Sequence, residues 1–227
     1  MNSSMMLDVR ADYVARIGRQ SLSFQYKHSS PSNRRIDPSS SNINDIYLLT
    51  SSYWTGYKNW IQDTSNKVAK PVAPTTQELS AEFDSLNDQR SISDTIIFNS
   101  AIFKPIFGKK ADTSLQAIFK VVKNSAIATS DNDIKSSVIN AINTYFDISN
   151  WDFGERFYFS ELSAYLHQVL TPNIASIVIV PANANVGFGN LYQINANPYE
   201  IIISAATVEN VEIITSLSAA QLNMGLN

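Results

Sequence analysis

Apolar residues along the first 90 positions recur at spacings typical of short helices, with polar loops between them. Leu7–Ile17 and residues 45–62 carry apolar or aromatic side chains every three or four positions, so we predict a helix in each segment. Ser21–Lys27 alternates apolar and polar residues and is predicted to be a strand. Residues 29–44 and 63–74 place prolines among polar residues, and both are expected to be loops.

A capping signal precedes a further helix in this part of the chain. Thr75 and Glu78 have the spacing of a capping box, in which each side chain satisfies the free backbone amide of the other residue. Leu79, Phe83 and Leu86 then supply the buried stripe of the helix that we predict after Thr75.

Beyond residue 90 the pattern changes to strands interrupted by two helices. Apolar residues at about every fourth position predict helices at Ile134–Phe146 and Glu161–Leu170, with Ser130 and Ser160 as candidate N-caps. Apolar runs and alternations predict strands in eight further segments: Thr95–Asn99, Ala101–Phe103, Leu115–Lys123, Glu155–Phe159, Ile174–Val180, Leu191–Asn195, Tyr199–Ser204 and Val211–Thr215.

This order of elements predicts an α+β fold. We expect a mixed β-sheet packed with two main helices over residues ~90–215, preceded by a smaller helical and loop-rich segment. Ile174–Val180 is almost continuously aliphatic, as expected for a strand with both faces covered. The predicted domains are a helical, loop-rich N-terminal segment at 1–90 and an α+β domain at 91–227.

The composition removes several classes of site. The chain has 227 residues, no cysteine and two histidines, His28 and His167, which excludes disulfide scaffolds, thiol nucleophiles and three-histidine zinc sites. The longest apolar run, Ile177–Ala182, is far shorter than the roughly 20 residues of a membrane-spanning helix. Charges at Asp8 and Arg10 come too early for a signal peptide. We therefore expect a soluble protein without a cleaved signal, a metal site or a cofactor.

The net charge of −3 is unevenly distributed along the chain. Residues 1–123 carry 15 basic and 11 acidic side chains, whereas residues 124–227 carry 2 basic and 9 acidic side chains. Such asymmetry can steer contacts between copies, although charged faces that are simply solvated give the same pattern.

Two glycine-containing segments fail as phosphate-binding loops. Phe107–Lys110 lacks both the upstream glycine and the Ser or Thr that must follow the lysine. Gly187–Gly189 lacks the third glycine of a dinucleotide fingerprint, and no helix is predicted after it. Both segments are better interpreted as turns.

The candidates for acid–base chemistry form no recognisable constellation. Neither His28 nor His167 has a metal-ligand partner at a suitable spacing, and His167 lies beside the core stripe of its predicted helix. Glu155 and Glu161 straddle a strand-to-helix turn, which defines no geometry for a glycosidase pair. We therefore predict no catalytic residues and a protein that is not an enzyme.

Aromatic residues cluster in the predicted helix at 45–62. Tyr53, Trp54 and Tyr57 could stack on nucleic acid, form the buried face of the helix, or anchor an interface with a partner. The acidic pI of about 5.4 argues against nucleic acid, and the other two interpretations remain open. Arg34 and Arg35 lie in a polar loop, where guanidinium groups can pair with carboxylates of a partner. The candidate interface residues are therefore Arg34, Arg35, Tyr53, Trp54 and Tyr57.

Nine segments, taken in their order along the chain, carry a resemblance to a known family: Phe24–His28, Arg34–Ser39, Asn42–Thr50, Ser93–Phe98, Phe103–Ala111, Asn143–Phe146, Trp151–Gly154, Phe157–Leu162 and Ile177–Pro181. Over roughly residues 20–215, they resemble the baseplate wedge protein of T-even-type contractile-tailed phages. The last part also resembles the wider baseplate J family, in which a short turn, an aromatic strand and a helix recur in that order. Members of the wedge family are considerably longer, and the resemblance is to their C-terminal portion.

The resemblance implies a structural protein of the virion, located in the tail baseplate and, during assembly, in the host cytoplasm. In this family the C-terminal part pairs subunits, and paired copies join six wedges into the inner baseplate ring. The implied partners are other copies of the chain, other wedge proteins and sheath-initiating proteins, with neither nucleic acid nor membrane among them.

Two rival functions belong to other classes. An enzyme with a hidden carboxylate or histidine site would require a closely spaced carboxylate pair in a deep cleft. A receptor- or carbohydrate-binding tail module would be favoured by aromatic side chains lining a shallow open groove.

Overall fold

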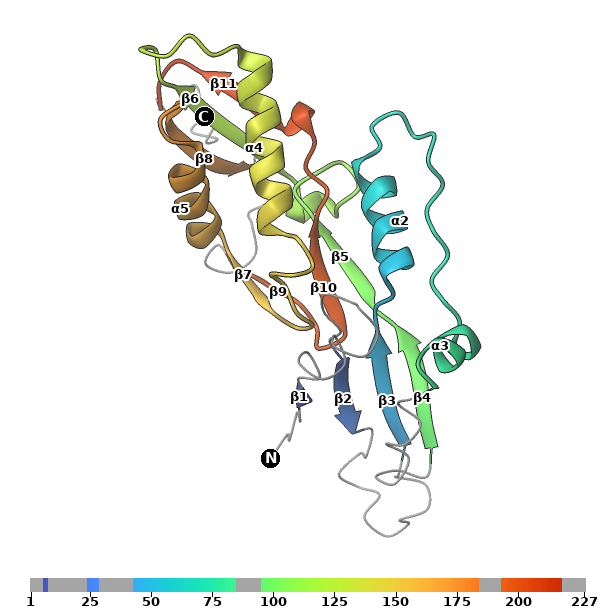
Figure 1. Ribbon diagram of the computed structural model, residues 1–227. Coiled ribbons are helices and arrows are strands. Elements are labelled where there is room, and N and C mark those ends of the chain that lie inside the picture. The colour runs from blue at the N-terminus through green and yellow to red at the C-terminus, as the bar shows by residue number, and fades with distance from the viewer. Residues whose placement is uncertain (1–5, 8–23, 29–42, 85–94, 184–192, 218–227) are drawn as a thin grey trace.

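The computed structural model describes residues 6–7, 24–28, 43–84, 95–183 and 193–217. These residues form an α+β fold, as predicted from the sequence (Figure 1). Its helices are α2 (Ser51–Gln62), α3 (Thr76–Glu82), α4 (Asp131–Tyr145) and α5 (Phe159–Leu170), with short 3-10 helices at Thr113–Leu115 and Val208–Asn210. Its strands are β1 (Met6–Leu7), β2 (Phe24–His28), β3 (Ile43–Leu48), β4 (Thr95–Ser100), β5 (Ile102–Ile106), β6 (Ala117–Lys123), β7 (Arg156–Tyr158), β8 (Ile174–Pro181), β9 (Gln193–Asn195), β10 (Glu200–Ser204) and β11 (Val211–Ile214).

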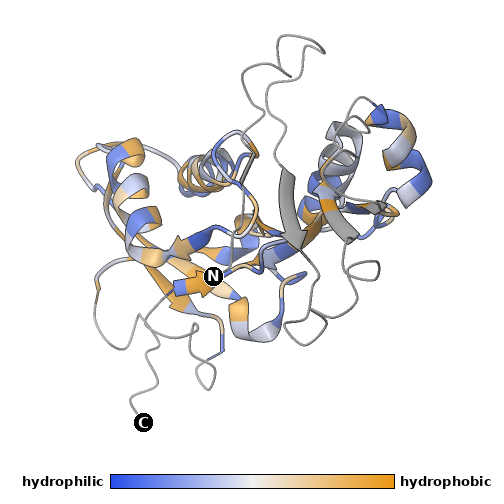
Figure 2. Cartoon of the chain, turned by 90° about the horizontal axis from the view of Figure 1, so that it is seen from below, coloured by the Kyte–Doolittle hydropathy of each residue, from blue (hydrophilic) through white to orange (hydrophobic). Residues whose placement is uncertain are grey.

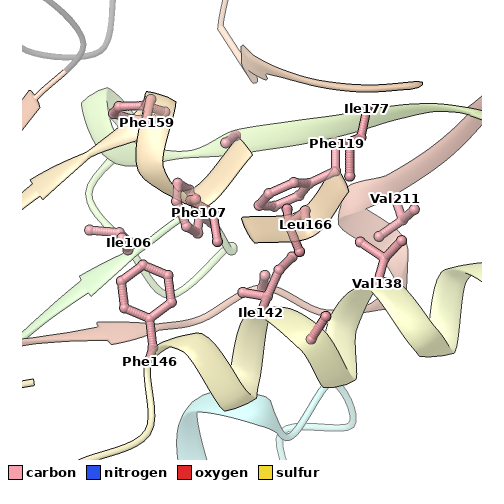
Figure 3. Packing of buried hydrophobic residues seen from close by; sticks show 14 of the residues in the cluster. Ile106, Phe107, Phe119, Val138, Ile142, Phe146, Phe159, Leu166, Ile177 and Val211 are labelled. Atoms are coloured by element: carbon pink, nitrogen blue, oxygen red, sulfur yellow. The ribbon is translucent and has the colours of Figure 1, made fainter. Parts of the chain in front are cut away.

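A three-stranded mixed sheet carries the larger core. Its order is β11-β6-β8, in which β11 runs parallel and β8 antiparallel to β6. The alternation in β6 buries Ala117, Phe119 and Val121, and these residues pack against apolar residues of α4 and α5 (Figure 3). Figure 2 shows apolar residues concentrated on the strands and in stripes along the helices. The two main helices thus cover the sheet because each buries one apolar stripe.

Phe107 lies at the centre of this core, between β5 and β6. Its ring makes edge-on contacts with Phe119, Phe146, Phe157 and Phe159, at centroid distances of 5.1, 5.8, 5.6 and 6.0 Å. Figure 3 shows Phe107 among side chains from several elements. Segments that are far apart in the sequence therefore meet on one aromatic ring.

The other described strands form separate sheets rather than extensions of the mixed sheet. β1, β2, β3 and β4 form one sheet, β5 pairs with β10 in parallel, and β7 pairs with β9 in antiparallel. The strands of the single mixed sheet expected over residues ~90–215 are thus divided among four sheets. The strands themselves agree closely with the predicted positions, because their apolar patterns are local.

The predicted domain boundary near residue 90 falls inside one of these sheets. β3 lies before this position and β4 after it, yet the two strands pair in parallel over six residue pairs. Helix α2 also packs on residues of β5 and β10, which both lie beyond residue 100. The described residues on the two sides of the boundary therefore share a sheet and a hydrophobic cluster.

Two local predictions are wrong, and a third lies largely outside the described residues. Residues 45–48 belong to β3 rather than to a helix: Ile46 and Leu48 are fully buried and alternate with half-buried Tyr47. The helix begins only at Ser51, because the Thr50 side chain accepts a hydrogen bond from the Tyr53 amide. Ser160 is no N-cap, because α5 starts one residue earlier, directly from β7. Of the predicted helix Leu7–Ile17, only Leu7 is described, and it lies in β1.

Candidate interaction surfaces

The aromatic face of α2 packs inside the chain. Tyr53, Trp54 and Tyr57 are 9%, 8% and 4% exposed. All three rings lie against Phe103 of β5, with centroid distances of 5.2, 5.7 and 4.2 Å, respectively. Burial, and secondarily the Tyr53 hydroxyl, raises the pKa of Tyr57 to about 12, as expected for a phenol shielded from water.

This burial changes the role that we assign to the α2 aromatics. An interface anchor must offer its own surface to a partner, and these three side chains retain little. The structure thus favours the buried-face interpretation over the anchor interpretation for Tyr53, Trp54 and Tyr57. Arg34 and Arg35 lie outside the described residues, and their proposed role stays a prediction.

A lysine from the loop after β5 fastens the C-terminal end of α2. The Lys110 ammonium donates hydrogen bonds to the carbonyls of Trp60 and Asp63, the latter at 2.7 Å, and lies 4.9 Å from the centre of the Trp60 ring. Lys70 approaches the same ring at 5.2 Å. Because α2 has no basic residue in its last turn, Lys110 supplies the positive charge that its free carbonyls favour.

The same loop shows why Phe107–Lys110 is not a phosphate site. The Lys109 ammonium pairs with the Glu209 carboxylate at 2.6 Å, and Lys110 is held by the end of α2. The adjoining cleft has a volume of about 300 Å³ and contains as many acidic as basic side chains. Its lining residues are Ile61, Asp63, Thr64, Asn66, Lys109, Lys110, Ala205, Thr207 and Glu209.

A larger, shallow groove is lined by residues from the C-terminal end of α4, from β7 and from the start of α5. We call it the tyrosine groove. Its volume is about 680 Å³, and its walls combine four aromatic residues with two glutamates, one arginine and one asparagine. The lining residues are Tyr145, Asn150, Trp151, Glu155, Arg156, Tyr158, Glu161 and Tyr165. A polar hollow of about 450 Å³ shares Asn150 with it.

The fold holds the aromatic walls of the groove in place. The Trp151 indole N–H donates to the Tyr145 carbonyl at 2.8 Å, and only 7% of Trp151 is exposed. The Tyr145 ring packs against Trp151 and Tyr165 at 5.8 and 5.2 Å. Burial, followed by the negative charges of Glu161 and Glu155, raises the pKa of the Tyr145 hydroxyl to about 12. The negative charges of both carboxylates are therefore felt at the Tyr145 hydroxyl.

The sequence missed this groove although it singled out Glu155 and Glu161. Glu155 lies directly before β7 and Glu161 in the first turn of α5, and both line the groove beside Tyr145, which comes from the end of α4. No local periodicity reports such a juxtaposition, since three elements create it. The only signal in the sequence was the number of aromatic residues between positions 145 and 165.

His167 is a structural residue, as expected from its place beside the helix stripe. Its Nδ1 bonds to the Ser163 carbonyl at 2.7 Å, and its Nε2 accepts a hydrogen bond from the Ile177 amide at 3.3 Å. This bond joins α5 to β8, which is an edge strand of the mixed sheet in the described part of the chain. His28, the other histidine, has no described side chain.

In the part of the chain that the structure describes, no three His, Asp or Glu side chains are grouped so as to hold a metal ion. None of the described helices is long and apolar enough to cross a membrane. Comparison of the sequence with protein-family models and with curated proteins finds no match.

Proposed function

We propose that this chain is a structural subunit of a contractile phage tail baseplate. In this role it is a wedge component of the virion that assembles in the host cytoplasm. It pairs with other copies and binds wedge and sheath-initiating proteins rather than acting as an enzyme. The basis for this role is the set of segments that resemble the wedge family and follow one another in the same order along the chain.

One observation supports the proposal most directly: four of the segments that carry the resemblance meet in one core. Phe107, Phe146, Trp151 and Phe157 come from four of these segments. Their rings contact one another, with Phe146 lying 5.1 Å from Trp151 and 5.3 Å from Phe157. If this chain has the same scaffold as the wedge family, the segments that resemble the family should pack together in one core, as these four do.

The shape of the molecule is consistent with a scaffolding role. Figure 1 shows an elongated body, with β2, β3 and β4 at one end and β6, β8, β11 and the two main helices at the other. Such a body offers separate surfaces at its two ends, so that one subunit can bind more than one neighbour at a time.

The experiment that tests self-pairing is light scattering on the purified full chain over a series of concentrations. We expect the mass to approach twice 25.2 kDa as the concentration rises. A constant mass of 25.2 kDa at every concentration would overturn self-pairing. Mass spectrometry of purified tails tests the baseplate assignment, and absence of the chain from them would contradict it.

A receptor- or carbohydrate-binding module is the second candidate, and the tyrosine groove is the observation that favours it. Aromatic residues line a shallow opening, as such a module requires. We rank it second because Trp151, the ring with the widest face for stacking on a sugar, is 93% covered and its N–H is already bonded to Tyr145.

A further inference from the structure

The tyrosine groove combines the two kinds of group that bind a guanidinium ion. Its walls provide the aromatic rings of Tyr145, Tyr158 and Tyr165, each partly exposed, and the carboxylates of Glu155 and Glu161, both exposed. A guanidinium group stacks on an aromatic face through its plane and binds carboxylates through its edge, and a single side chain can do both.

The two carboxylates of the groove keep capacity for a ligand. One Glu155 oxygen accepts the Asp152 amide at 3.0 Å. Among the described residues, the Glu161 carboxylate makes no hydrogen bond or ion pair, and Arg156 forms no ion pair with either glutamate. With two glutamates and one arginine in its walls, the groove has an excess of one negative charge, and neither glutamate is paired with a lysine or arginine of the described residues.

The wider charge pattern points the same way. Residues 124–227, which form the entire groove, carry 9 acidic and only 2 basic side chains. The raised pKa of the Tyr145 hydroxyl reflects the field of Glu161 and Glu155 as well as burial. A cation entering the groove is favoured by this field, whereas a neutral sugar gains nothing from it.

We propose that the tyrosine groove binds an arginine side chain presented by an exposed segment of a partner protein. The guanidinium stacks on the tyrosine rings and pairs with Glu155 and Glu161. Asn150, at the junction with the neighbouring polar hollow, is placed to bond to the backbone of the incoming segment. This inference rests on the proposed function only in taking the ligand to be a protein.

The test is a titration of the isotopically labelled full chain with the blocked peptide acetyl-Gly-Arg-Gly-Arg-Gly-amide, followed by NMR at low salt. We expect saturable shifts in the amides of residues 145–165, and none with the peptide in which citrulline replaces arginine. The Glu155→Gln/Glu161→Gln variant should bind the peptide about tenfold more weakly, because charge-assisted hydrogen bonds are lost. Tyr158→Leu should weaken binding severalfold by removing a π face.

A matched control separates this site from general attraction to an acidic protein. Asp112→Asn/Glu209→Gln removes the same charge from exposed positions outside the groove and should leave the affinity unchanged. Equal weakening in the two double variants, or the absence of saturable shifts, would overturn the proposal. Saturable shifts in the groove with oligosaccharides, but not with the peptide, would also overturn it and support the carbohydrate module.

The result of the peptide titration is independent of the result of the light-scattering test of self-pairing. A chain that stays monomeric at every concentration and still binds the peptide through Glu155 and Glu161 retains this site and loses only self-association. A chain that dimerises but does not bind the peptide keeps the proposed function and loses the arginine site.

Discussion

Phe107 and Gly108 form a tight turn after β5, and the turn packs so closely against Ala205 that position 108 has no room for a side chain. Phe107 has φ of 78°, in a region that bulky residues rarely occupy, and its ring is fully buried. Its amide donates to the Leu115 carbonyl, and its carbonyl accepts from the Ala117 amide, at 2.8 and 2.9 Å. Gly108 follows with its backbone against Ala205, where a Cβ atom would lie 1.7 Å from the carbonyl oxygen.

Replacing Gly108 by alanine should therefore destabilise the protein strongly. The new Cβ atom would collide with the carbonyl carbon and oxygen of Ala205, which belong to the backbone. The turn would have to move away from Ala205 to relieve the collision, so we expect the free energy of unfolding to fall by about 3 kcal/mol or more. Urea unfolding measures this loss.

The matched control is Gly56→Ala within α2, where the new Cβ would lie 3.4 Å from the Pro71 side chain, an ordinary contact. We expect this variant to gain up to about 1 kcal/mol from helix propensity. An unchanged urea midpoint for Gly108→Ala would contradict the close approach to Ala205.

At the scale of elements, side-chain caps determine where the helices begin. The side chains of Thr50, Thr75 and Ser130 each accept a hydrogen bond from the amide three residues later, at the starts of α2, α3 and α4. The predicted capping box of Thr75 and Glu78 is confirmed, since Glu78 also accepts the Thr75 amide at 2.8 Å. α5 begins without a side-chain cap because it continues from β7 and is held by its buried stripe.

Two serine variants distinguish a real cap from an apparent one. Ser130→Ala should destabilise the protein by about 1 kcal/mol, because it leaves the Asp133 amide without its acceptor. Ser160→Ala changes an exposed residue that forms no cap and should remain within about 0.5 kcal/mol of the wild type. Thermal unfolding of both variants checks the difference, and equal losses would contradict the assignment of the α5 start.

At the scale of the molecule, two hydrophobic clusters share the paired strands β5 and β10. The smaller cluster joins α2 to Phe103, Ile201 and Ile203, and the larger one includes Ile106 at the end of β5. Since β5 and β10 contribute to both clusters, neither can lose these strands without exposing the other. We therefore expect the described parts to unfold together.

Tryptophan fluorescence tests this cooperativity. Trp54 and Trp60 lie in or against the smaller cluster and Trp151 in the larger one. The variants Trp54→Phe/Trp60→Phe and Trp151→Phe therefore each report on one cluster. In each variant, we expect the fluorescence midpoint in urea to coincide with that of circular dichroism, which reports on the whole chain. A fluorescence midpoint distinct from it would support the two domains predicted from the sequence, with their boundary near residue 90.

The sequence by itself determined most elements and the α+β class. Ile134, Val138 and Ile142 are buried along α4, and the alternation in β6 is buried as expected, since both patterns depend only on near neighbours. The helix predicted over residues 45–62 wrongly includes residues 45–48, because Ile46, Leu49 and Tyr53 also fit a helical spacing. Only pairing with β2 and β4 decides that this segment is a strand.

Tertiary structure alone decided how the elements are grouped and where the surfaces lie. Pairing of β3 with β4 joins the two sides of the predicted boundary in one sheet, and contact with Phe103 places Tyr53, Trp54 and Tyr57 in the core. The fold also places Glu155 and Glu161 in one groove with Tyr145, which belongs to a different element, α4. The physical reason is one of range: periodicity records which face of an element is apolar, whereas a groove or a sheet depends on which distant element meets that face.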